Sequence, residues 1–414
     1  MRYLWFVLLW GYTALWAVDA TLKIEKDVEQ RSRIALIDGS ALGNQTFFHI
    51  LLSDFKISGH FLVDKIHHQG TFSSNYLLPL FQSREYVLKY TFSQEQGSHL
   101  GIRLLRVRDN KEVFHKSYTI PSRGKYPFLA HKAVSDINHF LHYQPIDWIN
   151  RYVVFSRYTT PRKSEIVLAD YTMTYQRVLI RGGLNLFPQW ADKKQTSLYY
   201  TSYNEMLPTL YLLNIYNGRK EKVLSSEGML VCSDVSADGS KLLLTMAPEG
   251  QADIYEWNRY THQKRRLTHF HGIDVNGKYL AGEQQFIFVS NRLGSANIFK
   301  KALGGAGVSK AVYHGRNNNA CDTYGNEIVY ISRESNHAFK SNLFNLYYTT
   351  LSGAETKPLT STGNNQFPRF SMDGSVVQFI KRRGASSSIG YINLKSHQSL
   401  LFPLSGKKIQ SIDW

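Results

Sequence analysis

The pattern of apolar and polar residues divides the chain into two regions, and the first of them has a mixed pattern. Apolar residues recur at helical spacing over 44–56 and again over 126–143, and Pro145 ends the second run. Four other segments have the pattern of short strands: 33–38, 86–92, 101–107 and 113–120. This combination predicts an α+β domain over residues 33–147.

From residue 148 onward the pattern changes to short strands separated by turn residues, and the segments repeat. The segment NLFPQWADKKQTSLYYTS (185–202) resembles NQFPRFSMDGSVVQFIKR (365–382). A third copy, at 231–246, follows the same plan, and weaker copies lie at 272–281 and 320–332. A repeat of 40–50 residues with four strands is typical of a β-propeller blade. One four-stranded sheet cannot bury both of its faces alone, whereas radial stacking buries them against neighbours.

The number of blades follows from counting complete and incomplete repeats. Five complete repeats begin near residues 187, 231, 271, 319 and 367. Three strands that precede them lack a first strand: 152–157, 164–171 and 175–182. The last eight residues, KKIQSIDW, form a first strand that lacks the other three. Because the two incomplete pieces complement each other, the sequence predicts a six-bladed propeller over 148–414, closed by the C-terminal strand. Trp414 aligns with Trp190 and Phe370, so we expect it to be packed inside.

The first strands of a propeller line its central channel, and the alignment of the repeats selects one residue from each. These residues are Gln189, Asp234, Asp274, Asp322, Arg369 and Asp413. Four of the six are acidic. One interpretation is that strand-end Asp residues cap turns. The other is a polar channel mouth that binds a partner segment or a cation.

The first twenty residues, MRYLWFVLLWGYTALWAVDA, have the features of a cleavable signal peptide. One early Arg precedes an apolar run from Tyr3 to Ala17, and the small residues Val18 and Ala20 fit positions −3 and −1 of a cleavage site. The alternative is a membrane anchor, but a run of about fifteen residues is short for a span of roughly 20. We therefore expect a signal peptide at 1–20, an extension at 21–32 and a mature protein that is exported and soluble.

Charge and cysteine content narrow the partners and the chemistry. The net charge is +17, but the basic residues are scattered, and the densest run is Lys264–Arg266. An export signal disfavours nucleic acid, and a basic exported protein suits anionic lipid, cell-wall polymer or an acidic partner. The alternative is that such scattered charge is simply a solvated surface. Cys232 and Cys321 fall near equivalent strands two blades apart, beyond the roughly 7 Å that a disulfide spans, so two buried free thiols are expected.

Motifs for catalysis and metal binding are absent from the sequence. It contains no G-x-S-x-G, no H-E-x-x-H and no cysteine pair at zinc spacing. Gly272–Lys278 (GIDVNGK) fits the first part of a phosphate loop, but Tyr279 follows where Ser or Thr is needed, so a blade turn is the better interpretation. The pairs His67-His68 and His269-x-His271 are interpreted as surface histidines. We predict no catalytic residue, metal or cofactor; the alternatives are a propeller enzyme with a channel-mouth carboxylate site and a peptidoglycan- or glycan-binding module.

The signal segment, the small α/β domain and a six-bladed propeller with repeats of the type N-x-F-P-x-[WF]-S-x-D-G-S together resemble the TolB family, although only two repeats keep an intact D-G-S turn. This family is the periplasmic component of the Tol-Pal system of Gram-negative bacteria. NNQFPRFSMDGS (364–375) and the two-part blade closure are the most specific marks of the resemblance. It implies a non-enzymatic adaptor that links a Pal-like outer-membrane lipoprotein to a TolA-like inner-membrane protein, with peptidoglycan or other outer-membrane proteins as further partners. It also implies roles in outer-membrane invagination during cell division and in envelope integrity.

The resemblance also implies two partner-binding regions. The Pal-like partner docks at a propeller face and channel mouth, which assigns the six aligned channel residues to this contact. The extension at the mature N-terminus contacts the TolA-like partner and can fold back on the body of the protein. Here the extension contains Leu22, Ile24 and Val28, which are apolar among charges. The alternative for this segment is an ordinary edge strand.

Overall fold

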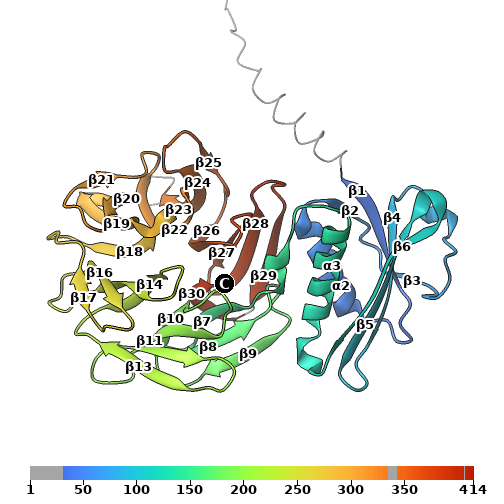
Figure 1. Cartoon of the computed structure of the whole chain (residues 1–414), viewed down its shortest axis with the longest axis horizontal. Coiled ribbons are helices and arrows are strands. Elements are labelled where there is room, and N and C mark those ends of the chain that lie inside the picture. The colour runs from blue at the N-terminus through green and yellow to red at the C-terminus, as the bar shows by residue number, and fades with distance from the viewer. Residues whose placement is uncertain (1–30, 334–342, 405) are drawn as a thin grey trace, which may run out of the picture.

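The structure is a computed structural model that describes residues 31–333, 343–404 and 406–414, and Figure 1 shows an α/β domain beside a propeller. The predicted signal peptide and residues 21–30 of the extension lie outside the described residues. In the part that the structure describes, no helix combines the length and the apolar character that a membrane crossing needs.

The N-terminal domain consists of one mixed sheet and two helices. Its strands are β1 (Ser32–Asp38), β2 (Phe61–Val63), β3 (His68–Gln69), β4 (Tyr86–Ser93), β5 (Ser98–Arg106) and β6 (Lys111–Ile120). The sheet order is β2-β1-β4-β5-β6, with β3 also beside β1. Strand β1 pairs in parallel with β2, β3 and β4, whereas β4, β5 and β6 are antiparallel. Short 3₁₀ turns lie at η1 (Pro79–Phe81), η2 (Val107–Asp109) and η3 (Arg123–Lys125), and η4 (Asp147–Asn150) leads into the propeller.

The helices α2 (Gln45–Ser58) and α3 (Pro127–Phe140) follow from local signals in the sequence. The side-chain oxygen of Asn44 accepts a hydrogen bond from the backbone N–H of Phe47 (2.9 Å), which caps the start of α2. Gly59, in the left-handed conformation (φ 80°), ends α2. Proline occupies the first turn of α3, where its missing N–H costs nothing. Helix α3 ends at Phe140, three residues before the end that the apolar pattern predicts.

Six four-stranded sheets form the propeller, and we number the blades in chain order of their first strands. Blade 1 is β10 (Asn185–Trp190), β11 (Ser197–Ser202), β12 (Thr209–Asn214) and β13 (Lys220–Ser225). Blade 2 is β14 (Leu230–Val235), β15 (Lys241–Met246), β16 (Asp253–Asn258) and β17 (Lys264–Arg266). Blade 3 is β18 (Asp274–Tyr279), β19 (Gln285–Leu293), β20 (Ser295–Ala302) and β21 (Val308–Lys310), with η5 (Ala281–Glu283) between the first two strands.

The remaining blades contain the two ends of the propeller region. Blade 4 is β22 (Arg316–Tyr324), β23 (Glu327–Arg333), β24 (Phe344–Thr350) and β25 (Thr356–Pro358). Blade 5 is β26 (Asn364–Phe370), β27 (Val376–Arg383), β28 (Ser386–Asn393) and β29 (Ser399–Leu404). Blade 6 is β30 (Lys408–Asp413), β7 (Val153–Thr160), β8 (Lys163–Ala169) and β9 (Gln176–Ile180). The predicted six-bladed propeller is therefore confirmed.

The C-terminal strand closes the ring, as the repeat count predicts. Strand β30 pairs antiparallel with β7, and Ile412 lies opposite Phe155. Ile409 and Ile412 are fully buried. Trp414 is packed as expected: its indole N–H donates to the carbonyl of Phe370 (2.6 Å), and its ring stacks on Tyr391 with centroids 5.3 Å apart. The end of the chain is thus part of the core.

One hydrophobic cluster continues from the N-terminal domain into blades 5 and 6. Val134 of α3, Trp148, Tyr391 of β28 and Ile412 of β30 all belong to it. The other blade interfaces have separate, smaller clusters. The interface that the C-terminal strand completes therefore shares its core with the N-terminal domain, and the two domains pack as one unit.

The outer edge strands of the blades differ according to what they face. Strands β13 and β17 have the sequences KEKVLS and KRR, and their charged side chains face solvent. Strand β29 is the apolar segment SLLFPL, and it packs near α2. Lysine on an exposed edge strand prevents pairing with another chain, whereas a covered edge needs no such protection. Part of the excess of basic residues is explained by this role.

A buried polar cluster lies in the domain interface. His131 of α3 is fully buried, with its Nδ1 2.9 Å from Asp54 of α2 and its Nε2 3.2 Å from Asp170 of the turn after β8. The hydroxyl of Tyr171 donates to Asp54. Burial alone would lower the pKa of His131, but the two carboxylates outweigh burial and raise this pKa to about 9. We call His131, Asp54 and Asp170 the seam triad.

Candidate functional site

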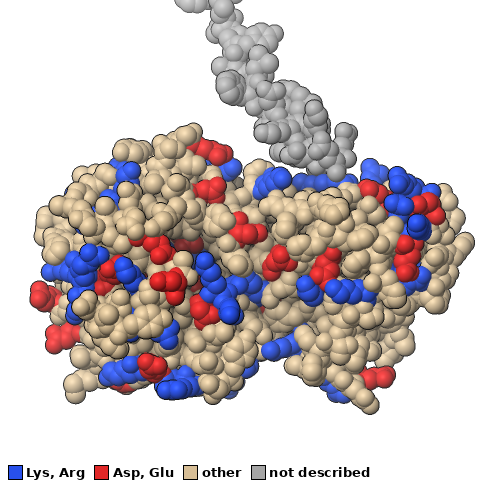
Figure 2. Space-filling model, in the orientation of Figure 1, with Lys and Arg blue, Asp and Glu red and all other residues tan. Residues whose placement is uncertain are grey.

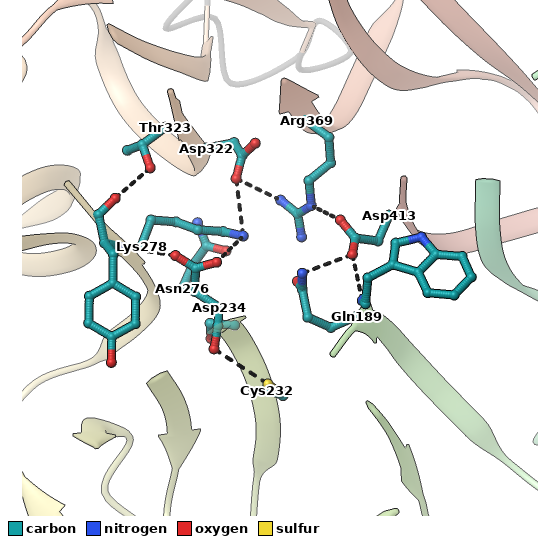
Figure 3. A network of polar contacts seen from close by, with 12 residues as sticks. Gln189, Cys232, Asp234, Asn276, Lys278, Asp322, Thr323, Arg369 and Asp413 are labelled. Atoms are coloured by element: carbon teal, nitrogen blue, oxygen red, sulfur yellow. Dashed lines mark hydrogen bonds and ion pairs between the residues drawn. The ribbon is translucent and has the colours of Figure 1, made fainter. Parts of the chain in front are cut away.

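Six side chains from the six first strands meet at the propeller axis, and we call them the axial ring (Figure 3). They are Gln189, Asp234, Lys278, Asp322, Arg369 and Asp413. Their spacings along the chain are 45, 44, 44, 47 and 44 residues, which is close to one blade each. Five of these six residues were selected from the sequence.

The structure corrects the sixth residue, Asp274. Asp274 begins β18, is fully buried and forms an ion pair with Arg292 (2.9 Å), so it does not reach the ring. Lys278, four residues further on, occupies the ring position. Blade 3 lacks the compact turn of the other repeats, so its first strand is out of step with the repeat spacing at Asp274. Two signals identify Lys278: it lies 44 residues from both Asp234 and Asp322, and the aromatic Tyr279 follows it.

A β-bulge lies just before the ring position in each first strand. In four blades the residue two positions before the ring residue has a positive φ although it is not glycine. These residues are Phe187 (φ 55°), Asn276 (φ 57°), Ala320 (φ 53°) and Phe367 (φ 50°). A bulge bends the strand and turns the following side chain in a new direction. Here it directs the ring side chains toward the axis.

The three ring carboxylates connect neighbouring blades through backbone hydrogen bonds. Asp413 accepts from the N–H of Trp190 (2.7 Å) and from the side-chain amide of Gln189 (2.8 Å). Asp234 accepts from the N–H of Tyr279, and Asp322 from that of Phe370, both at 2.8 Å. The interfaces between blades 6 and 1, 2 and 3, and 4 and 5 are thus each held by a carboxylate. Asp413 connects the closing strand to the first complete blade.

The two cations of the ring lie between these carboxylates. Lys278 Nζ is 3.0 Å from Asp322 and 3.9 Å from Asp234. Arg369 is 3.4 Å from Asp413 and 3.9 Å from Asp322. Lys278 is only 2% exposed, so its charge is buried between the two carboxylates. Charges therefore alternate around the axis from Asp234 to Asp413, and Gln189 completes the circle.

The environment of the ring shifts the pKa of its carboxylates. Burial raises the pKa of Asp413 to about 6, although Arg369 and Lys278 oppose this shift. The pKa of Asp234 is also raised, by burial and by the charge of Asp322, against the effect of Lys278. The ring is thus a charged cluster in which protonation begins at mildly acidic pH.

Two cavities lie at the ends of the channel, with the ring between them. The first has a volume of about 230 Å³ and is lined by all four positive-φ residues together with Met229. The second, of about 180 Å³, is lined by Trp190, Asp413, Trp414 and other residues at the carboxyl ends of the first strands. Gln189 lines both cavities.

The position of the N-terminal domain distinguishes the two mouths. It contacts the turns between third and fourth strands, at Asp170 and Asn393. In a propeller these turns lie at the same end as the turns between first and second strands, where the 180 Å³ cavity is found. The 230 Å³ cavity therefore opens at the opposite end. We call it the open mouth, and the other the domain-side mouth.

The channel also contains the two cysteines of the chain. Cys232 and Cys321 are buried and free, as expected, and burial raises the pKa of both thiols, that of Cys321 to about 12. Neither thiol is therefore a thiolate at neutral pH. The described residues include no group of three or more His, Cys, Asp or Glu placed to hold a metal ion.

These features define a two-domain β-propeller protein with an ion-paired axial channel. The sequence profile of the TolB beta propeller domain matches residues 150–414. The Tol-Pal system protein TolB of Wolinella succinogenes is 43% identical over 421 residues, which cover 99% of each chain. The protein of the same name from Helicobacter hepaticus is 38% identical over the full length of both chains. The chain therefore belongs to the TolB family of the Tol-Pal system.

The solved structures agree with this fold. The crystal structure of TolB from Acinetobacter baumannii superposes with a TM-score of 0.77 at 20% identity, over 92% of this chain and 96% of that one. The propeller and the α/β domain thus share one arrangement with a protein of distant sequence. The predicted contact residues of the N-terminal extension, Leu22, Ile24 and Val28, lie outside the described residues.

Proposed function

We propose that this protein is a non-enzymatic periplasmic adaptor that links a Pal-like outer-membrane lipoprotein to a TolA-like inner-membrane protein. Through this link it supports outer-membrane invagination during cell division and envelope integrity. The full-length relationship to proteins of the Tol-Pal system supports the proposal. The predicted export signal is consistent with it.

The open mouth is the feature that best supports a docking role for the propeller. Strained backbone conformations cluster at ligand sites, because the surrounding structure must hold them in place. Four such residues line this one cavity, and the side chain of Met229 at its edge is 43% exposed. Two ring residues, Gln189 and Arg369, also line this cavity, so they form part of its floor. The Pal-like partner accordingly docks on the rim and against this floor.

A pair of methionine variants tests this docking site. Met229→Glu places a charge at the open mouth, and Met372→Glu places the same charge at the domain-side mouth, where Met372 is 54% exposed. Co-purification with the soluble domain of a Pal-like lipoprotein from the same organism is the measurement. We expect Met229→Glu to weaken capture about tenfold or more and Met372→Glu to leave it unchanged. Equal capture by both variants, or loss in Met372→Glu alone, would overturn the assignment.

The N-terminal extension provides the second link of the adaptor. Its apolar residues Leu22, Ile24 and Val28 alternate with charges, which suits a segment that docks reversibly. Replacing all three with Asp removes the apolar face, whereas replacing Lys23 and Lys26 with Gln leaves it intact. Crosslinking to a TolA-like domain should be lost only in the first variant. Retained crosslinking in the first variant would assign the contact to another surface.

The two alternative functions have less support. An enzyme would need a carboxylate free to exchange protons with a substrate, but the ring carboxylates bind backbone N–H groups and cations. A glycan module driven by charge would need a basic face. On the face seen in Figure 2, however, Lys and Arg are mixed with Asp and Glu. The glycan-binding alternative predicts that the protein is retained on isolated peptidoglycan. If charge alone drives this binding, the retention should vanish at moderate salt.

A further inference from the structure

A second cavity lies between the two domains, away from the channel. Its volume is about 280 Å³, and we call it the seam pocket. The residues that line it come from both domains: Arg31, Ser58, Gly59, His60, Tyr143, Gln144, Asn393, Lys395 and Ser396. The pocket forms where the end of α2 meets the turn after β28. Gly59 allows this approach, because a Cβ at its position would lie 2.4 Å from the side-chain oxygen of Ser396.

The charge of the seam pocket is one-sided. Arg31, His60 and Lys395 line it, and none of its lining residues carries a carboxylate. Within the described residues, Arg31 donates only to the carbonyl of Ser396 (3.3 Å), and neither Arg31 nor Lys395 has an ion-pair partner. Burial lowers the pKa of His60, and the nearby charges of Lys395 and Arg31 lower it further. The pocket therefore has a positive potential that the described side chains leave uncompensated.

Two backbone carbonyls at the end of α2, beside the pocket, already accept hydrogen bonds. At the end of α2, the carbonyl of Ile57 accepts from the side-chain amide of Asn393 (3.2 Å), and the carbonyl of Lys56 accepts from the N–H of Gly59 (3.2 Å). The ring of His60 stacks on Tyr143 at 4.7 Å, which fixes its orientation. The pocket thus offers a ligand two cations, Arg31 and Lys395, on opposing walls, with the oriented ring of His60 beside them.

We propose that the seam pocket binds an oxyanion of the phosphate type. A guanidinium and an ammonium form short, charge-assisted hydrogen bonds to phosphate oxygens, and a protonated imidazole adds a third. Arg31 and His60 belong to the N-terminal domain and Lys395 to blade 5, so the bound anion bridges the two domains. A soluble phosphate ester and a lipid phosphate headgroup share this chemistry. The cationic residues of this site are not among the partner contacts proposed above.

The test is titration calorimetry of the full mature chain with inorganic phosphate at constant ionic strength. The variant is Lys395→Gln, and the matched control is Lys163→Gln, an exposed lysine of blade 6. We expect the wild-type protein and the control to bind with the same affinity, and Lys395→Gln to bind about tenfold more weakly. Binding should also raise the pKa of the His60 imidazole, which NMR titration reports and His60→Gln assigns. Equal affinity for wild type and Lys395→Gln, or no detectable binding to wild type, overturns the proposal.

Two further arms identify the source of the anion. In the first arm, the protein is mixed with vesicles that contain phosphatidate or with vesicles of phosphatidylcholine alone. Retention on the phosphatidate vesicles only, and its loss in Lys395→Gln, would assign a lipid headgroup. Binding of inorganic phosphate without vesicle retention assigns a soluble ester. The chain itself offers a rival, because Glu25, Asp27 and Glu29 precede Arg31 in the sequence. A triple variant that combines Glu25→Gln, Asp27→Asn and Glu29→Gln tests this rival. If phosphate binds only to the triple variant, the acidic segment is the resident anion and the proposal is overturned.

Discussion

The axial ring and the seam triad both place charges in the protein interior, but they compensate these charges differently. In the ring, each carboxylate has one backbone N–H and at least one cation within 4 Å, and cavities lie on both sides. In the triad, one imidazole lies between two carboxylates, and all three side chains are fully buried. The ring therefore borders open cavities, whereas the triad is sealed between the two domains.

The comparison extends to acid–base behaviour. The folded pKa values of Asp413 and His131 are both raised, to about 6 and about 9. A raised folded pKa stabilises the protein below the unfolded value, and this stability is lost as pH rises through the folded value. The ring should therefore lose stability between about pH 4 and 6, and the triad between about pH 6.5 and 9. The two regions can be separated by pH alone.

The largest expected effect is from deletion of residues 409–414. The deletion removes two fully buried isoleucines and the ring carboxylate Asp413, and it opens the edges of blades 5 and 6. Loss of a buried Ile side chain costs about 2–5 kcal/mol, so the sum approaches the whole stability of a typical domain, about 5–15 kcal/mol. We expect loss of cooperative thermal unfolding or of soluble protein. Because the same core contains the N-terminal domain, that domain should be destabilised too.

The matched control for this deletion is removal of two residues from the exposed turn at 304–307, which joins β20 and β21. This change should shift the melting temperature by a few degrees at most. A protein without residues 409–414 that melts like the full chain would contradict closure of the ring by the C-terminal strand.

The next largest effect is expected for His131→Gln. The substitution leaves the carboxylates of Asp54 and Asp170 buried without a cation, which typically costs about 3–5 kcal/mol. Urea denaturation at pH 7 measures the loss. His139→Gln is the control, because His139 contacts Asp147 in an exposed pair and should cost less than about 1 kcal/mol. Similar losses in the two variants would mean that the seam triad contributes no more than a surface pair.

The pH dependence separates the triad from the ring. Because the folded pKa of His131 is about 9, the unfolding free energy of the wild-type protein should decline from pH 6.5 to pH 9 by about 3 kcal/mol. The His131→Gln variant should lack this decline. Denaturant titrations of both proteins across this range provide the measurement. A wild-type curve as flat as that of the variant would show that His131 is neutral in the folded protein.

The ring should respond in the acidic window. The stability that protonated Asp413 contributes is present below about pH 4 and lost as pH rises through about 6. The difference in unfolding free energy between wild type and Asp413→Asn should therefore fall by about 2–3 kcal/mol over this range. A difference that does not change with pH would contradict a raised pKa at this position.

How far the sequence could predict this molecule depends on whether the signal was periodic. Six blades and their closure followed from repeat spacing, because each blade solves the same packing problem with similar residues. Helix α2 followed from apolar spacing over 44–56, and its observed end at Ser58 is set by Gly59. Strands β2 and β3 were missed, since segments of three and two residues are too short to show alternation. Tertiary pairing with β1 forms them.

The candidate site was predicted in part for the same reason. Five ring residues followed from the repeat, and the sixth was misplaced where blade 3 departs from it. The positive-φ residues were not foreseen, because Phe187 and Phe367 are residue types that rarely adopt this conformation and nothing local marks them. The seam triad joins Asp54, His131 and Asp170, which lie far apart in the chain without a motif. Only the packing of the two domains brings them together.

A double-mutant cycle between Lys278 and Asp322 tests most directly that the axial ring is one connected unit. The single variants Lys278→Met and Asp322→Asn and the double variant are compared by denaturant unfolding, and a parallel cycle replaces Lys278→Met with Asp274→Asn. The 3.0 Å ion pair predicts a coupling of about 1 kcal/mol or more for Lys278 with Asp322, and a value near zero for Asp274 with Asp322. Zero coupling in the first cycle, or strong coupling in the second, would contradict the ring.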